Sequence, residues 1–114
     1  MEDPAYYDVD VDGLLVAGAF HEAIDILEKV ALANINATAT QRSVCLYLGL
    51  TYYFLGEYKT SIENFQRALS LDENSAYAHT SLAYIYAACP DERFRDCAQA
   101  VVHATRGCEL TEWK

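Results

Sequence analysis

The sequence predicts an all-α fold built as a stack of antiparallel helix pairs, about three pairs in total. The pattern Leu-Gly-x-x-Tyr that begins at Leu48 returns as Leu-Ala-x-x-Tyr at Leu82, 34 residues later. Helix pairs with a fixed period near this length bury a continuous core only by packing each unit on the next. The composition agrees, because two prolines and five glycines in 114 residues leave little room for strands and hairpins.

One whole unit can be followed from Leu48 to Leu71. Its pattern positions are Leu48, Gly49, Tyr52, Gly56, Tyr58, Ser61, Ile62, Phe65, Ala68 and Leu71. The pattern resembles the tetratricopeptide repeat (TPR), in which the first helix carries a Leu-Gly pair and a Tyr, a Gly turns the chain, and the second helix carries spaced Ala, Phe and Ala. Ser61 stands where that family usually has Ala, and Glu73 where a Pro commonly ends the unit. The resemblance implies a right-handed superhelical stack, a TPR-like α-solenoid.

The resemblance extends over almost the whole chain and predicts one domain, residues 1–114, with repeats at approximately 4–37, 42–75 and 76–114. Moved back by 38 residues, the second-helix pattern falls on Gly18, Phe20, Ala23, Ile24, Leu27 and Val30. Moved forward by 39 residues, it falls on Val101, Ala104, Gly107 and Leu110. The extra residues of the third unit are expected in the turn around Pro90, because Pro ends a helix.

Each helix has its own sequence signal. Ile24, Leu27 and Val30 form one apolar stripe of the second helix. The motif Thr38-x-x-Gln41 predicts a capping box that opens the third helix. Asn and Ser are good N-terminal caps, so the fifth helix is expected to begin after Asn74 or Ser75. The predicted helices are 9–17, 20–32, 39–55, 58–71, a helix from this cap to 89, and 93–110.

The resemblance also separates core residues from the rest. Four aromatic residues fall at family core positions: Tyr52, Tyr86, Tyr58 and Phe20. Cys45 and Cys108 fall at positions that face neighbouring helices, and they are predicted to be reduced core side chains. Cys89 and Cys97 flank the inserted turn, and the sequence leaves their redox state open.

Charge and hydropathy exclude several classes of partner. The formal charge is −9, with 17 acidic against 8 basic residues, so phosphate backbones and anionic lipid surfaces repel the chain. No apolar run approaches the ~18 residues that a membrane span needs. The acidic start Met1-Glu2-Asp3-Pro4 does not resemble a secretory signal, which would be basic and then apolar. We therefore expect a cytoplasmic protein with no nucleic-acid or membrane partner.

No metal, cofactor or catalytic site is predicted. The Asp8-x-Asp10-x-Asp12-Gly13 run resembles the start of a calcium loop, but Ala19 stands where that loop needs a bidentate Glu. The cysteines are spaced by 44, 8 and 11 residues, unlike the close pairs of structural zinc sites. The three histidines, His21, His79 and His103, share no ligand spacing and no nucleophile constellation. The chain is therefore not expected to be an enzyme.

In the TPR family the first helix of each pair lines a concave binding surface, and the corresponding positions here are rich in Tyr and Leu. They are Leu46, Tyr47, Leu50, Tyr53 and Phe54 in unit two, and Tyr77, Thr80, Ser81, Tyr84, Ala87 and Ala88 in unit three. None is the Lys, Arg or Asn that family members use to hold a chaperone's acidic tail. The resemblance thus implies an adaptor for an apolar or amphipathic helix or peptide, including one with basic residues.

Two alternatives remain open at the level of sequence. The chain is either a self-assembly element, with a second copy covering the surface near Tyr77, Tyr84, Val102 and Trp113, or a piece of a longer scaffold. The segments 88–96 and 108–114 resemble a TPR variant of some bacterial proteins, in which more repeats usually follow. By that likeness, this chain is short for its kind.

Overall fold

The all-α fold is confirmed by the computed structural model, which describes residues 11–111. Within this range the chain forms six α-helices and one 3-10 turn, with no strand. The elements are α2 (Val11–Val16), α3 (Phe20–Ala33), α4 (Thr38–Phe54), α5 (Tyr58–Leu71), α6 (Ala76–Ala88), η1 (Glu92–Phe94) and α7 (Cys97–Thr111). The expectations for Asp8, Val9, Asp10 and Trp113 concern residues outside the described range.

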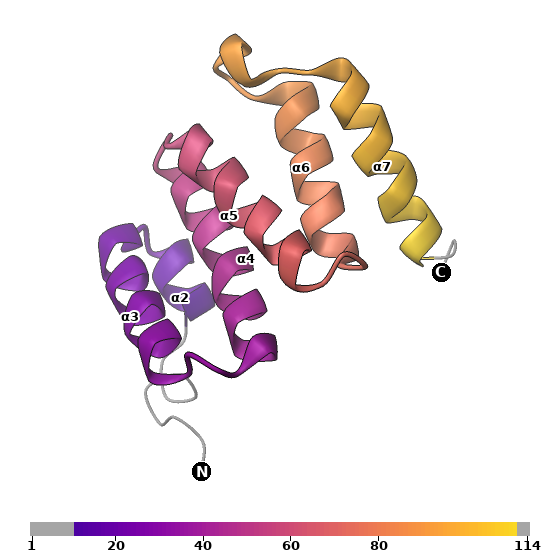
Figure 1. Cartoon of the computed structure of the whole chain (residues 1–114). Helices are drawn as coiled ribbons and strands as arrows, with labels where there is room; N and C mark the ends of the chain where they lie inside the picture. Colours follow the sequence, from indigo (N-terminus) through magenta and orange to yellow (C-terminus); the bar gives the residue numbers. More distant parts are fainter. Residues whose placement is uncertain (1–10, 112–114) are drawn as a thin grey trace.

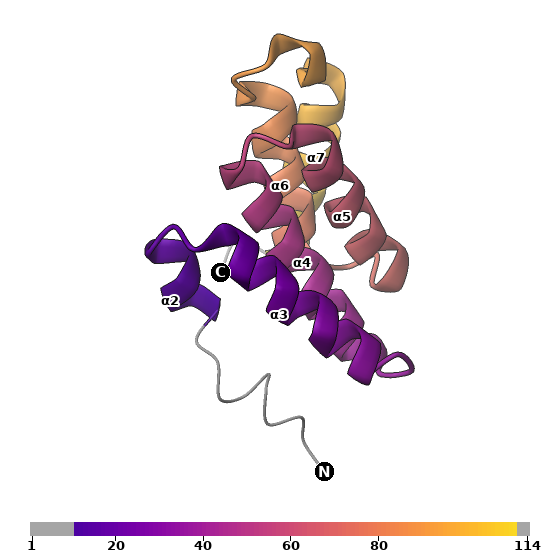
Figure 2. The same cartoon turned by 90° about the vertical axis from the view of Figure 1, so that its left-hand side faces the viewer.

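The helices form three hairpins that stack in chain order: α2 with α3, α4 with α5, and α6 with α7 (Figure 1). Each hairpin packs on the next through α3 against α4 and α5 against α6. In the perpendicular view α2 and α5 lie on opposite sides of the stack, with α4 between them (Figure 2). This is the arrangement of a helical repeat, in which each unit contacts mainly its neighbours.

Glycine turns the chain in the first two hairpins. Gly18 and Gly56 have φ of 80° and 82°, which an L side chain rarely adopts. After Gly56, the Glu57 amide donates to the Tyr52 carbonyl over 2.9 Å, while the Gly56 amide donates to Tyr53 over 3.0 Å. This pair of bonds is the Schellman motif, which satisfies carbonyls at a helix C-terminus. The same two bonds recur around Gly18. The two turns, 38 residues apart in the sequence, therefore share their backbone conformation as well as their residue pattern.

The core consists of clusters between successive hairpins. Phe65 lies at the centre of one cluster and is only 2% exposed. Gly49 lets α4 approach this ring, because a Cβ at that position would lie 2.8 Å from it. Ser61 is buried where the family usually has Ala, and its hydroxyl donates to the Gly49 carbonyl over 2.6 Å. The fully or nearly buried side chains of the two larger clusters are Val11, Leu15, Ala23, Leu27, Val30, Val44, Phe65, Leu82, Ile85 and Cys89.

One predicted helix start and one predicted cap are wrong, and another cap is confirmed. The last helix begins at Cys97 and not near 93, because Asp91 accepts from the Arg93 amide in a short 3-10 turn and Asp96 accepts from Gln99 at the new helix start. At α4 no capping box forms, since the N-cap is Ala37. Ser75 does cap α6, its hydroxyl accepting from the Ala78 amide.

The side chain of Gln41, which the capping box would have used, has a different role. Its amide nitrogen donates to the carbonyls of Ala31 and Asn34 over 2.7 and 2.8 Å. Those carbonyls belong to the C-terminal end of α3, where helices leave acceptors without intrahelical partners. Gln41 therefore closes the preceding helix and joins α3 to α4.

The four aromatic residues predicted for the core are less buried than expected. Phe20, Tyr58 and Tyr86 pack on the core clusters but remain partly exposed. Tyr52 is also partly exposed and lies in a hollow on another face, which Glu28, Glu63 and Arg67 also line. The innermost positions are instead occupied by Phe65 and by aliphatic side chains.

The end of the stack differs from expectation for a simple reason. On α5, Phe65 is buried because α6 covers it. On α7, the matching Ala104 and its neighbour Val101 are exposed, and so is Cys108, because no described helix covers that side. Gly107 is buried as expected, since it faces α6, where a Cβ would lie 2.7 Å from the Thr80 methyl group.

Candidate functional site

A groove of about 360 Å³ runs between α4 and α6, on the side lined by the first helices of hairpins two and three. α4 and α6 supply eight of its nine lining residues, and α5 supplies the ninth, Phe65. The lining residues are Leu50, Tyr53, Phe54, Phe65, Tyr77, Thr80, Ser81, Tyr84 and Ile85. None of these side chains carries a formal charge.

The structure brings together most of the residues that the sequence analysis assigned to the concave face. Leu50, Tyr53, Phe54, Tyr77, Thr80, Ser81 and Tyr84 all line the groove. Their helical spacing explains this, because residues three or four apart on one helix share a face.

Four residues of the same expectation lie elsewhere. Leu46 and Tyr47 are partly buried and pack against core clusters, and they do not line the groove. Ala87 and Ala88 are exposed near the C-terminal end of α6, away from the lining set. The groove is therefore shorter along each helix than the sequence pattern predicts.

Two lining residues were not among the expected ones. Phe65 was assigned to the core, and its ring does belong there, but one side of it also faces the groove. Ile85 follows Leu82 by three residues on α6 and is 2% exposed. Together they make an apolar floor beneath the tyrosines. For Ile85, the helical spacing from Leu82 and Ser81 was the signal that could have found it. Phe65 lies on α5, and its place beside the groove depends on how α5 packs against α4 and α6.

The aromatic side chains form a connected set across the two helices. The ring of Tyr53 lies 6.1 Å from that of Tyr84 and 6.2 Å from that of Phe54, both in edge-on arrangements. Tyr77 meets the Phe65 ring edge-on at 6.4 Å. Edge-on pairs of this kind are a favoured geometry for aromatic rings, so the groove side chains already pack on one another in the free protein.

The exposed fractions show which rings are available for binding. Phe54, Tyr77 and Tyr84 are 52%, 49% and 59% exposed. Large apolar side chains of this exposure, grouped in one hollow, are typical of interaction surfaces. Tyr is an effective anchor because it offers a large rigid face with a single polar tip.

The tyrosine hydroxyls are held in the neutral form. Burial, together with a hydrogen bond to Tyr84, raises the pKa of Tyr53 to about 12. Burial and the nearby Asp12 carboxylate raise the pKa of Tyr77 above its ordinary value. At neutral pH both hydroxyls are therefore available as donors and acceptors of hydrogen bonds and carry no charge.

The described residues form neither a cluster of metal ligands nor a membrane-spanning helix. Over residues 11–111, no group of three or more His, Cys, Asp or Glu side chains is placed to hold a metal ion. None of the described helices has the length and apolar character needed to cross a bilayer.

The groove lies within the part of the chain that matches a protein-family model. Residues 49–88 match the family model described as TPR repeat. All nine lining residues lie within this segment, which runs from α4 through α5 to the end of α6. No curated protein shows a significant match to the chain.

Proposed function

We propose that this chain, whose residues 49–88 belong to the tetratricopeptide repeat family, is a non-catalytic adaptor that binds a segment of another polypeptide in the α4–α6 groove. Tetratricopeptide repeats are generally protein-interaction modules and are typically non-catalytic scaffolds. The observation that carries the proposal is the uncharged, tyrosine-lined groove with half-exposed rings at its rim.

The chemistry of the groove defines the partner. An apolar floor with neutral hydroxyls at the rim suits an amphipathic helix or an extended peptide with apolar anchors. An acidic tail has no cation to pair with among the lining residues, and the chain's charge of −9 repels it. The same charge favours a segment with basic residues beside its apolar anchors. The free cysteines suit a reducing compartment such as the cytoplasm.

Affinity purification of the chain from its native source, followed by mass spectrometry, identifies the partner, and binding is then measured with purified components. Tyr84→Lys places a charge in the groove at a side chain that is 59% exposed in the free protein. We expect this change to weaken binding at least about tenfold, because a large aromatic anchor in a binding groove carries much of the binding energy. Circular dichroism should show unchanged helical content.

Val102→Lys is the matched control. Val102 is 57% exposed, nearly the same as Tyr84, but it lies on α7 outside the groove. The control makes the same change of charge and should retain full affinity. Unchanged binding by Tyr84→Lys, or equal loss in both variants, would show that the groove is not the binding site. Leu50→Lys is a poorer test, since Leu50 also packs against two core clusters.

A second candidate function, self-assembly, is favoured by the uncovered side of α7. Val101 and Val102 are 65% and 57% exposed there, whereas the matching side of α5 is covered by α6. A helix of a second copy would bury the same kind of surface. This proposal predicts reversible dimers in sedimentation experiments, with Val102→Lys weakening them and Tyr84→Lys not doing so. A monomer at every concentration would rule it out.

A further inference from the structure

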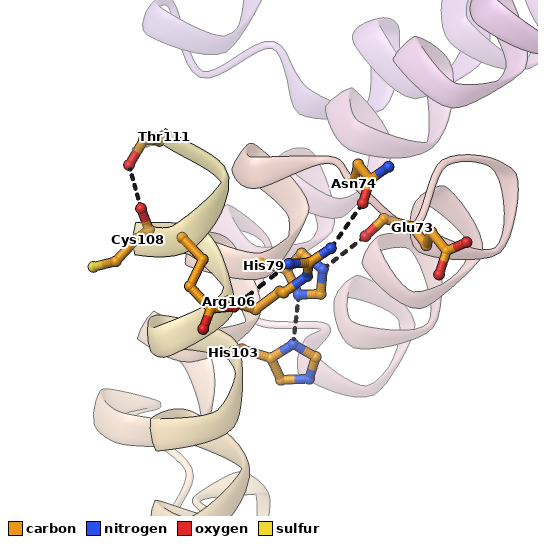
Figure 3. Close-up of polar contacts among 8 residues, drawn as sticks. Glu73, Asn74, His79, His103, Arg106, Cys108 and Thr111 are labelled. Carbon is orange, nitrogen blue, oxygen red and sulfur yellow. Dashed lines mark hydrogen bonds and ion pairs between the residues drawn. The ribbon is translucent and has the colours of Figure 1, made fainter. Parts of the chain in front are cut away.

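A pair of histidines joins α6 to α7 on the face of the third hairpin that Glu73 and Glu109 also line. The Nδ1 atoms of His79 and His103 are 2.9 Å apart, and the Nε2 atom of His79 lies 3.0 Å from the Glu73 carbonyl oxygen. Figure 3 shows this chain of contacts, which links the loop before α6, α6 itself and α7. Histidine side chains titrate near neutral pH, so the contact depends on proton occupancy.

The contacts fix where the protons must be. The Glu73 carbonyl can only accept, so His79 donates to it through Nε2–H. In the neutral His79 ring, Nδ1 is then an acceptor, and His103 must donate Nδ1–H to it. His103 can gain a proton at Nε2 without disturbing this bond. A second added proton can go only to His79 Nδ1, where it would face the Nδ1–H of His103.

The surroundings do not compensate a second positive charge. The Tyr86 ring stacks on His103 at 5.9 Å between centroids. The Arg106 guanidinium, one turn further along α7, donates to the Asn74 side chain over 2.9 Å and pairs with Glu109 over 3.4 Å. Glu73 contacts the pair through its backbone carbonyl. Arg106 therefore adds positive charge beside the histidine pair. The Glu109 carboxylate already pairs with Arg106.

We propose that the His79–His103 pair is a pH-responsive latch, which holds α7 on α6 when neutral or singly protonated and releases it when both rings are charged. The head-on arrangement of the two rings, with centroids 5.2 Å apart, suits a shared proton along the line between the nitrogens. Because α6 carries the Tyr77 and Tyr84 side of the groove, release of α7 removes the support behind that wall.

The sign of the pH dependence follows from the environment of His103. Burial, and secondarily the neighbouring His79, lowers the pKa of His103 below its ordinary value. The unfolded chain therefore binds this proton more readily than the folded chain. The contribution of His103 to stability is fully present above about pH 6.5, the ordinary His value, and is lost as the pH falls from there toward the lowered pKa. This first proton leaves the bond between the rings in place, and release of α7 follows only when the second proton is taken up at still lower pH. Each unit of lowering corresponds to a tenfold fall in the ratio of folded to unfolded protein.

Nuclear magnetic resonance titration of the three imidazoles tests the pair directly. His21 is exposed on α3 and provides an internal reference in the same sample. We expect the pair to take up protons in two separated steps felt by both rings, as coupled groups do. If the His79 and His103 signals each changed in one step, independently of one another, the latch would not exist.

Hydrogen exchange and substitution locate the effect. Between about pH 7.5 and about pH 5, amide protection in α7 should fall before protection in α3. His103→Gln removes one of the two titrating rings, so the pair can no longer carry two charges, and it should reduce the loss of thermal stability over this pH range, whereas His21→Gln should not. Equal pH dependence in all three proteins, or α7 protection that does not change with pH, would overturn the proposal. If His103→Gln failed to fold, the exchange measurement on the wild-type chain would still decide.

Discussion

Truncation of Phe65 is the most severe single test of how the stack is held together. Phe65 is 2% exposed and lies where the second and third hairpins meet, against Leu82 and Ile85. Phe65→Ala removes the α5 ring on which α4 and α6 both pack. The cavity left by the ring would lie beside Gly49, because a Cβ at that position would be 2.8 Å from the ring. Gly49 has no side chain that could fill this cavity.

The expected cost is large relative to the stability of a small domain. Cutting a fully buried Phe to Ala costs about 3–5 kcal/mol, from lost burial plus the cavity left behind. Typical domains are stable by only about 5–15 kcal/mol in total. Tyr52, which the repeat pattern also assigns to the core, is partly exposed and outside the core clusters, so Tyr52→Ala should cost about 1 kcal/mol, the typical value for point mutants.

Denaturant unfolding followed by far-ultraviolet circular dichroism measures both variants against the wild-type chain. The comparison is valid where the slope of free energy against denaturant is unchanged, since a changed slope signals an altered unfolding mechanism. Phe65→Leu, which keeps much of the volume, should cost less than half as much as Phe65→Ala. Equal losses for Phe65→Ala and Tyr52→Ala would refute the assignment of the core centre to Phe65.

Three further predictions follow from local contacts. Gly49→Ala should destabilise by about 1–3 kcal/mol through overpacking against Phe65; thermal melting measures this, and a neutral result would contradict the close helix approach. Ser75→Ala should cost about 1 kcal/mol by removing the α6 cap, whereas a loss under a few tenths would show that the cap does not matter. In the folded chain a thiol reagent should label Cys97 and Cys108 quickly and Cys45 and Cys89 only on unfolding, because the first two thiols are exposed and the others buried; mass spectrometry of the labelled peptides gives the order, and rapid labelling of Cys45 would contradict it.

The regular part of the fold could be predicted from the sequence because it depends on local rules. The 34-residue period and the glycines at Gly18 and Gly56 mark hairpins whose turns require a positive φ. The start of α6 was also predictable, since Ser75 is a cap with a local mechanism. Helical spacing was enough to group most groove residues on one face of α4 and α6.

The features that sequence analysis missed depend on what lies next to each helix. Gln41 has good capping-box spacing, but the carbonyls at the end of α3 are nearer partners for its side chain. Val101 and Ala104 occupy positions that are covered on α5, and they are exposed because no described helix lies over them. Whether Tyr52 is buried also depends on neighbouring units, which a one-dimensional pattern does not contain.

Site-specific photo-crosslinking tests the central claim, that the α4–α6 groove receives another polypeptide, most directly. A photoreactive phenylalanine analogue in place of Tyr84, at the groove rim, should crosslink one defined partner in the native source. The same analogue in place of Val102, equally exposed on α7, should not crosslink that partner. Crosslinks to the partner from Val102 alone, or crosslinks from Tyr84 only to other copies of this chain, would contradict the account.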